Sequence, residues 1–172
     1  MDITEVILTD HHEQRRMFSI LEQIDRNDTA RLAPVWERLR VLLEVHAKAE
    51  ELLFYPQLLE LGKGEGGKDS PEEETTDAIH DHNEIRDAIR DVDAHPVGSD
   101  AWWDAVAKAN EANGDHMAEE EREGLADFRR HASLELRHAM GLDFAVFEAA
   151  HAGGIPLENE DPDEYVQEHE GH

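Results

Sequence analysis

The chain of 172 residues contains no cysteine. This absence excludes disulfides, thiolate metal sites, iron–sulfur clusters and thiol nucleophiles. Basic residues are also few, because 16 Lys and Arg stand against 42 Asp and Glu, for a formal net charge of −26. We therefore expect no nucleic-acid partner, since phosphate neutralisation needs cationic side chains. An anionic membrane surface would repel the same charge.

Long apolar segments are missing as well. No run approaches the roughly 18 apolar residues of a membrane span. The first residues, MDITEVILTDHHEQRR, show neither the basic nor the apolar region of a secretory signal. We therefore expect a cytoplasmic protein without a membrane partner, and the length suits one domain around a single core.

Hydrophobic periodicity predicts an all-α fold. Apolar residues recur at helical spacing in four long windows and a fifth shorter one, whereas alternation with a period of two is not sustained. Ser70-Pro71 and Ser99 are typical helix N-termini. The predicted helices cover about residues 2–25, 29–56, 71–95, 99 onward and 133–151.

Four long helices with short connections favour an up-down-up-down four-helix bundle with an additional C-terminal helix. We expect the bundle to span residues 1–130 and the accessory helix residues 131–153. An acidic tail, residues 154–172, is predicted to be disordered. The accessory helix could cover the bundle as a lid or form a homodimer surface with its apolar face. That face carries Leu136, Met140, Phe144 and Phe147.

Histidine is abundant, with twelve residues, roughly three times an average share. Four of them continue the apolar helix stripes that should face the bundle interior, and two glutamates join them. These six residues are His11, His46, Glu50, His82, His116 and Glu120. Burying such ionisable groups is costly unless something compensates, and a bound metal is the compensation that this set predicts.

The six residues form a repeat. In each half a lone histidine, His11 or His82, is followed 35 or 34 residues later by a His-x-x-x-Glu motif that starts at His46 or His116. The halves can therefore pair about a pseudo-two-fold axis. The i, i+4 spacing separates His and Glu by about 6 Å along one helix face, and a carboxylate can then bridge two ions ~3.5–4 Å apart. Imidazole and carboxylate ligands suit iron or manganese better than zinc.

Two further histidines lie close to this set in sequence. His80-Asp-His-Asn-Glu84 has the same His-x-x-x-Glu spacing but falls on the polar face of its helix. His12 lies at the margin of the first apolar stripe. We consider both as possible additional ligands or as residues that support the ligands. The remaining histidines are predicted to be at the surface.

Four segments carry a resemblance to a known family. They are Asp10-His11-His12-Glu13, His46-Ala-Lys-Ala-Glu50-Glu51, Asp81-His82-Asn83-Glu84 and His116-Met-Ala-Glu-Glu120-Glu121. In order and spacing they resemble the hemerythrin-like HHE cation-binding domain, over roughly residues 1–130. The resemblance implies a four-helix bundle that holds two iron ions, bridged by carboxylates and by an oxo or hydroxo group. In that family such centres bind or sense O2, handle NO or decompose peroxide.

The sequence departs from the O2-carrying members of that family. Those members have a second histidine four residues from the ligand on the third helix, but four residues before and after His82 this chain has Ala78 and Arg86. They also have an aspartate at the position of Glu121. Each iron is then expected to have two histidines and an open position, which favours redox turnover over reversible O2 binding. Tyr55 could fill one of these positions if Pro56 distorts its helix and turns the phenol inward. Glu121 is kept as a further carboxylate near the site.

Three functions fit this interpretation. The first is catalase-like decomposition of H2O2 by a di-iron oxidoreductase that protects against oxidative stress. The second is non-enzymatic binding or sensing of O2, NO or iron. The third is a helical module with a degenerate metal site. Manganese is the alternative metal in each case.

Overall fold

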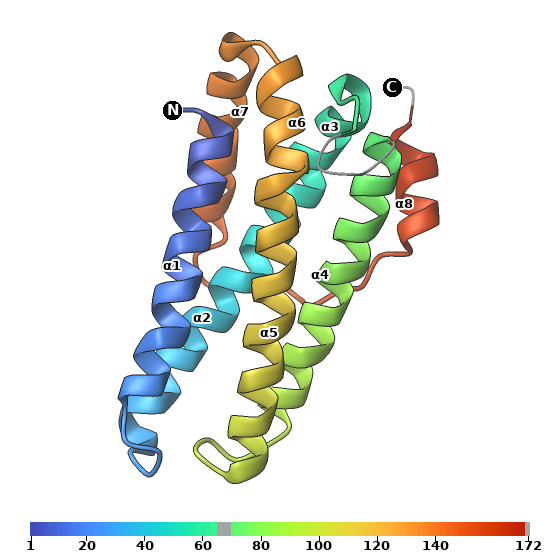
Figure 1. Ribbon diagram of the computed structural model, residues 1–172. Helices are drawn as coiled ribbons and strands as arrows, with labels where there is room; N and C mark the ends of the chain where they lie inside the picture. Colours follow the sequence, from blue (N-terminus) through green and yellow to red (C-terminus); the bar gives the residue numbers. More distant parts are fainter. Residues whose placement is uncertain (65–69, 171–172) are drawn as a thin grey trace.

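The computed structural model describes residues 1–64 and 70–170, and in these ranges it is all-helical. Four long helices run up, down, up and down, with the short connections between the first pair and between the second pair at the same end (Figure 1). They are α1 (Ile3–Gln23), α2 (Thr29–Ala49), α4 (Pro71–Asp93) and α5 (Asp100–Arg122). The predicted all-α bundle is therefore confirmed.

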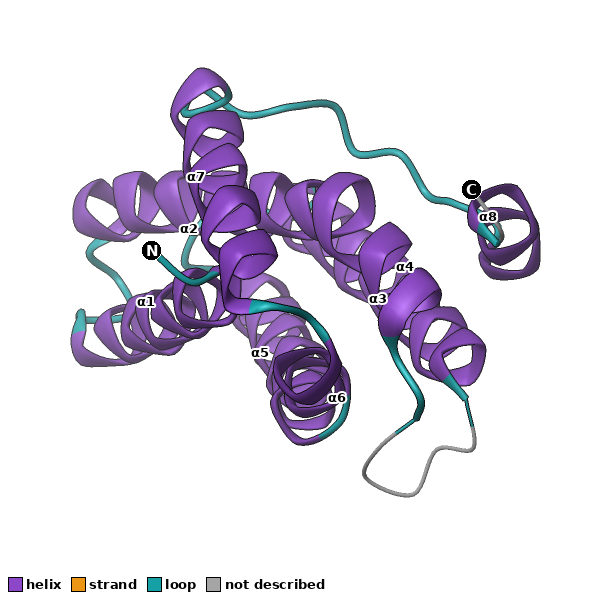
Figure 2. Ribbon diagram, turned by 90° about the horizontal axis from the view of Figure 1, so that it is seen from above, coloured by secondary structure: helices purple, strands orange, loops and turns teal. Residues whose placement is uncertain are grey.

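Shorter elements extend and flank the four long helices. A π-helical turn, η1 (Glu50–Phe54), and α3 (Tyr55–Leu61) continue α2, while α6 (Gly124–His131) continues α5. The accessory helix α7 (Leu134–Ala150) packs against α1 and α2, and α8 (Pro162–His169) packs against α4. Figure 2 shows α7 and α8 on different sides of the bundle.

Side-chain caps fix where these helices begin. The Ser70 hydroxyl accepts from the Glu73 amide and the Ser99 hydroxyl from the Trp102 amide, as the sequence predicts. Such caps satisfy amide groups that have no acceptor within the helix. The other capping side chains are Asp2, Asp28, Ser133 and Asp161.

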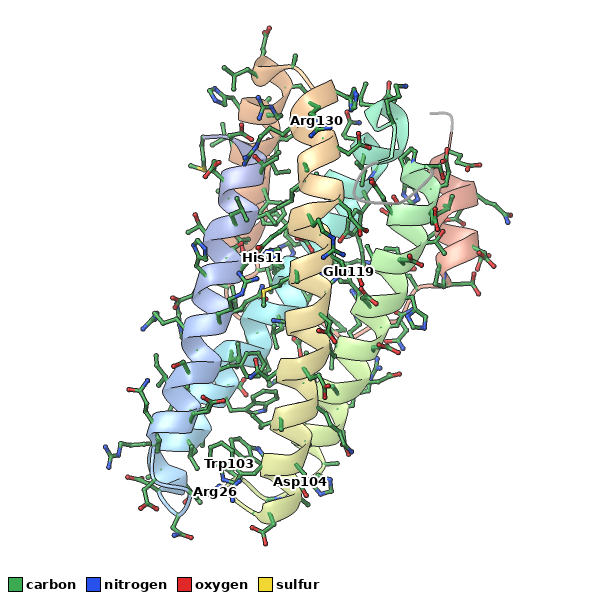
Figure 3. All side chains as sticks on the ribbon, in the orientation of Figure 1. His11, Arg26, Trp103, Asp104, Glu119 and Arg130 are labelled. Carbon is green, nitrogen blue, oxygen red and sulfur yellow. The ribbon has the colours of Figure 1, made fainter. Side chains whose placement is uncertain are left out.

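The bundle interior consists of two apolar clusters with a polar layer between them. The first cluster, at the end that carries the chain termini, includes Ile7, Phe54 and Phe128, and the second includes Phe18 and Trp102. The helices α1, α2 and α4 contribute residues to both clusters, whereas α5 contributes to the second cluster and its continuation α6 to the first. All four long helices contribute to the polar layer. The polar layer consists of His11, Gln14, His46, Glu50, His82, Asn113, His116 and Glu120, all buried. Figure 3 shows this level at His11, midway between Trp103 at one end and Arg130 at the other.

The predicted second helix is interrupted where it meets the polar layer. Instead of running to Pro56 as one α-helix, α2 ends at Ala49 and the chain continues as the π-helical turn η1. Proline lacks the N–H that an α-helix needs at this point, so the turn before it widens to i→i+5 bonding. The amide of Tyr55 accordingly bonds to the Glu50 carbonyl.

The accessory helix is a lid on the bundle. Its residues Met140 and Phe144 are buried in the first apolar cluster, and Leu136 and Phe147 pack against that cluster. The face considered for a homodimer is therefore occupied within the chain. None of the helices in the described residues is long and apolar enough to cross a membrane.

The acidic tail, for which the sequence predicts disorder, contains a helix. Residues 162–169 form α8, in which Tyr165 and Val166 are buried against the first apolar cluster. The helices α4 and α3 supply the surface on which α8 packs. The amino-acid composition of the tail, from which disorder is predicted, carries no information about that surface.

Two glycines in helices predict opposite effects of one substitution. A Cβ at Gly141 of α7 would lie 2.5 Å from the Met1 carbonyl oxygen and 3.0 Å from the Ile3 amide, whereas a Cβ at Gly114 of α5 would meet nothing within 4 Å. We expect Gly114→Ala to raise the free energy of unfolding by up to about 1 kcal/mol through helix propensity. Gly141→Ala should lower it by about 1 kcal/mol or more, because α7 must move off α1. Urea denaturation of both variants measures this, and equal stabilisation by the two would contradict the close packing of α7.

Candidate metal centre

The six predicted metal ligands meet in the polar layer. Glu50 lies between the two histidine pairs: His11, His46 and Glu50 offer ligand atoms within 4.8 Å of one another, and so do Glu50, His82 and His116. Each of the four long helices contributes one imidazole. Two neighbouring groups of potential ligand atoms thus share one carboxylate.

The two oxygens of Glu50 face different histidines. Its Oε1 lies 2.9 Å from His46 Nε2, and its Oε2 lies 3.2 Å from His82 Nε2. Glu120 makes the equivalent cross-bundle contact, with its Oε2 3.3 Å from His11 Nε2. The pseudo-two-fold repeat of the sequence is thus repeated in the contacts.

The inward-facing atoms of this cluster fit bound cations. His11 Nε2, His46 Nε2, both carboxylate oxygens of Glu50 and Glu120 Oε2 make ion-pair contacts within the cluster but no well-aligned hydrogen bond in the described part of the chain. Buried polar atoms normally have hydrogen-bond partners, because leaving them unpaired is costly. Metal ions bind nitrogen and oxygen atoms of this kind that converge on one place, and so compensate for the cost of burying them.

A ring of carboxylates holds the outer nitrogens of the four imidazoles. Each carboxylate is the chain neighbour of a ligand on one helix and contacts the histidine of the next helix around the bundle. The contacts to the Nδ1 atoms are Asp10–His46 (3.1 Å), Glu51–His82 (3.0 Å), Asp81–His116 (3.4 Å) and Glu121–His11 (2.9 Å). Carboxylates in this position set the tautomer of a metal-binding imidazole and turn its Nε2 inward.

Three carboxylates of this ring are functional residues that the sequence reasoning did not single out: Asp10, Glu51 and Asp81. Their signal is the repeat of Asp-His and Glu-Glu in both halves of the chain. Glu121, which the sequence predicts as a further carboxylate near the site, belongs to the ring. Arg86, found where a second histidine would stand in the O2 carriers, is buried and donates to Glu51 at 2.8 Å.

The cluster is rich in negative charge. Its six carboxylates, two facing inward and four in the ring, contact three basic side chains: Arg15, Lys48 and Arg86. Burial disfavours the charged imidazolium, but Glu50 and Asp10 outweigh burial and raise the pKa of His46 well above its ordinary value. For His82, burial again lowers the pKa, but Glu50 and Glu51 outweigh burial and raise it to about 9. Without metal, protons therefore supply the positive charge that the carboxylates require.

Tyr55 reaches the cluster because of the π-helical turn. In an α-helix, a side chain five residues after Glu50 would point about 140° away from it, and i→i+5 bonding brings the two onto one face. The buried hydroxyl of Tyr55 donates to Glu120 Oε1 at 2.7 Å. Burial and the nearby carboxylates raise the pKa of this phenol well above its usual value, so the proton stays on Tyr55.

A small cavity of about 20 Å³ adjoins the cluster between α3, α4 and α5. This volume holds about one water-sized molecule. Tyr55, His116 and Glu120 line its inner part, and its other lining residues include several carboxylates. These are Glu74, Asp77, Asp81, Glu119 and Glu123.

His12 and His80 do not reach the buried cluster. His12 is exposed on α1, and the side chain of His80 is 63% exposed on α4, 3.9 Å from Glu84. Both lie on the outward faces of helices whose inward faces carry the clustered histidines, so the 3.6-residue period separates them from the site. The surface group His80, Asp81 and Glu84 is therefore distinct from the buried ligands.

The comparison with protein families agrees with this geometry. The model of the hemerythrin HHE cation binding domain matches residues 2–135. The chain belongs to this family. The match covers the bundle and α6 and ends at the start of α7. Curated proteins and solved structures gave no significant match. The hemerythrin-family domain thus has His/Glu clusters that are able to bind metal cations.

Without metal, the stability of this hemerythrin-family chain should fall as the pH rises, and with metal it should not. The pKa of His82 is about 9 in the folded state against 6.5 for the free side chain. Its protonation therefore stabilises the metal-free fold fully below about pH 6.5, and this contribution, on the order of 3 kcal/mol, disappears as the pH rises through about 9. Metal binds the deprotonated imidazoles, so loading should remove this loss.

Thermal unfolding between pH 6 and 9.5 measures this difference. We expect the Tm of the metal-free protein to fall over this range and that of the loaded protein not to. His82→Gln should flatten the metal-free profile, whereas His80→Gln on the exposed face should leave it unchanged. A metal-free Tm that is constant or rises with pH would show that the imidazoles do not hold protons in the fold.

Proposed function

We propose that this domain holds two iron ions and decomposes hydrogen peroxide. The observation that carries the proposal is the equal division of the ligands. His11 and His46 form one pair, His82 and His116 the other, and the oxygens of Glu50 face both. Two similar ions would then each keep room for a small molecule. Manganese is the alternative metal that the same donors suit.

The proposed reaction needs no external electron donor. One H2O2 is oxidised to O2 while a second is reduced, so that 2 H2O2 give 2 H2O and O2. The ions would supply the redox change, and the protein supplies their position and surroundings. The two apolar clusters on either side of the polar layer keep bulk water away from it.

The residues around the cavity favour a small neutral substrate. A cavity of about 20 Å³ suits a molecule as small as H2O2, O2 or NO. The carboxylates that line it repel anions such as superoxide or nitrite. Tyr55 places a proton beside this cavity, held between its oxygen and Glu120 Oε1.

Oxygen evolution from H2O2 tests the proposal. We expect the iron-loaded chain to release O2 and the His116→Ala variant to lose at least ten-fold of the rate, because one ion loses an imidazole. His80→Ala, which changes an exposed histidine at the same His-x-x-x-Glu spacing, should keep the full rate. Circular dichroism of the variants checks that the bundle remains folded. A rate for the unaltered chain no higher than that of His116→Ala would overturn the proposal.

Reversible binding of O2, NO or iron is the second candidate function. It is favoured by the burial of the cluster, since all four imidazoles and both inward carboxylates are at most 5% exposed. A stable spectrum of the diferrous protein with O2 or NO, lost on removal of the gas and without O2 release from peroxide, would identify this function. The cytoplasmic location remains a prediction from the sequence.

A further inference from the structure

The π-helical turn leaves one carbonyl without a partner in the helix. In an α-helix the carbonyl of Glu51 would accept from the amide of Tyr55, four residues later. That amide bonds to the Glu50 carbonyl instead. The next amide in π-helical register would belong to Pro56, which has no N–H. A carbonyl left unpaired at this buried position would be costly.

The C-terminal helix supplies the missing donor. The hydroxyl of Tyr165, on α8, donates to the carbonyl oxygen of Glu51. The tyrosine is 6% exposed, so this bond is shielded from water. Burial near Glu51 and Glu160 raises the pKa of the phenol, which keeps the donating proton in place.

The segment before α8 is attached to α2 and α4 by specific bonds. Glu160 accepts from Lys48 at 2.7 Å, and its backbone exchanges two hydrogen bonds with the Asn83 side chain, at 2.6 and 3.0 Å. Arg90 donates to the Leu157 carbonyl at 3.0 Å. Lys48 and Asn83 are each within two residues of a histidine of the metal centre. The tail is thus attached at the level of the polar layer.

Glu51 connects this attachment to the metal centre. Its side chain holds His82 Nδ1 at 3.0 Å and Arg86 at 2.8 Å, and its chain neighbour Glu50 carries the shared carboxylate. Any shift of the turn would therefore move a ligand and the support of another ligand together. Tyr55, at the other end of the turn, would move with them.

We propose that Tyr165 is a positioning residue of the metal centre. By binding the carbonyl that Pro56 leaves free, it fixes the π-helical turn on which Glu50, Glu51 and Tyr55 depend. This inference rests on the proposed metal-binding function, but it concerns a residue outside the family match, which ends at residue 135. The tail of the chain is then part of the metal site rather than an appendage.

Tyr165→Phe tests the proposal, because it removes the hydroxyl and keeps the ring in the apolar cluster. The matched control is Val166→Ala, which weakens the packing of the same helix and leaves the hydrogen bond intact. In the metal-free full-length chain, we expect Tyr165→Phe to speed amide exchange in residues 52–58 at least ten-fold. Val166→Ala should speed exchange in α8 and leave residues 52–58 unchanged.

The iron-loaded chain gives the second measurement. We expect Tyr165→Phe to lose metal to a chelator about ten-fold faster than the unaltered chain, in line with other residues that support ligands. Val166→Ala should lose metal at the original rate. Exchange and metal loss both unchanged in Tyr165→Phe, or changes confined to α8, would overturn the proposal. If the unaltered chain binds no metal, the proposed function fails, and exchange in residues 52–58 still decides whether Tyr165 holds the turn.

Discussion

Burial of charge in the middle of the bundle is the constraint on which the rest of the structure depends. Six carboxylates and four imidazoles lie in or against one layer, with apolar clusters on both sides. Such a layer is unfavourable unless positive charge is placed among the carboxylates. Protons on the imidazoles can supply it in the metal-free chain, and metal cations bound by the same side chains can supply it instead. Folding and metal binding are therefore linked in this domain.

The carboxylate ring explains how four separate helices form one site. Each helix supplies a ligand and also supports the ligand of the next helix, so that no imidazole is positioned by its own helix alone. The two halves of the chain repeat this arrangement but differ in the residue five positions after the glutamate. Five residues after Glu50 stands Tyr55, whereas five residues after Glu120 stands Leu125. On one side of the centre, the phenol therefore donates a hydrogen bond to Glu120.

The helices and the six clustered residues could be predicted from the sequence because both depend on a local period. A side chain's place on the helical wheel decides whether it faces the interior, and this is enough for His46 with Glu50 and for His116 with Glu120. The ring carboxylates could not be assigned in this way, since the partner of Asp10 lies on another helix. The wheel places such residues at the margin of the stripe, where a surface position is equally compatible with the pattern.

The π-helical turn and the ordered tail depend on contacts between distant parts of the chain. Pro56 predicts a distortion, but its form follows from the packing of Tyr55 against Glu120 and of Tyr165 against Glu51. The last residues contain few apolar side chains, and composition alone therefore predicts disorder. Their order depends on packing and on hydrogen bonds to residues much earlier in the chain, among them the bond from Tyr165 to the Glu51 carbonyl.

Anomalous diffraction from crystals of the iron-loaded protein, recorded at the iron absorption edge, is the most direct test of the metal centre. Two peaks are predicted in the polar layer, one between His11 and His46 and one between His82 and His116, with Glu50 contacting both. A single peak, peaks at the surface group around His80, or no peak in the polar layer would contradict a two-metal centre.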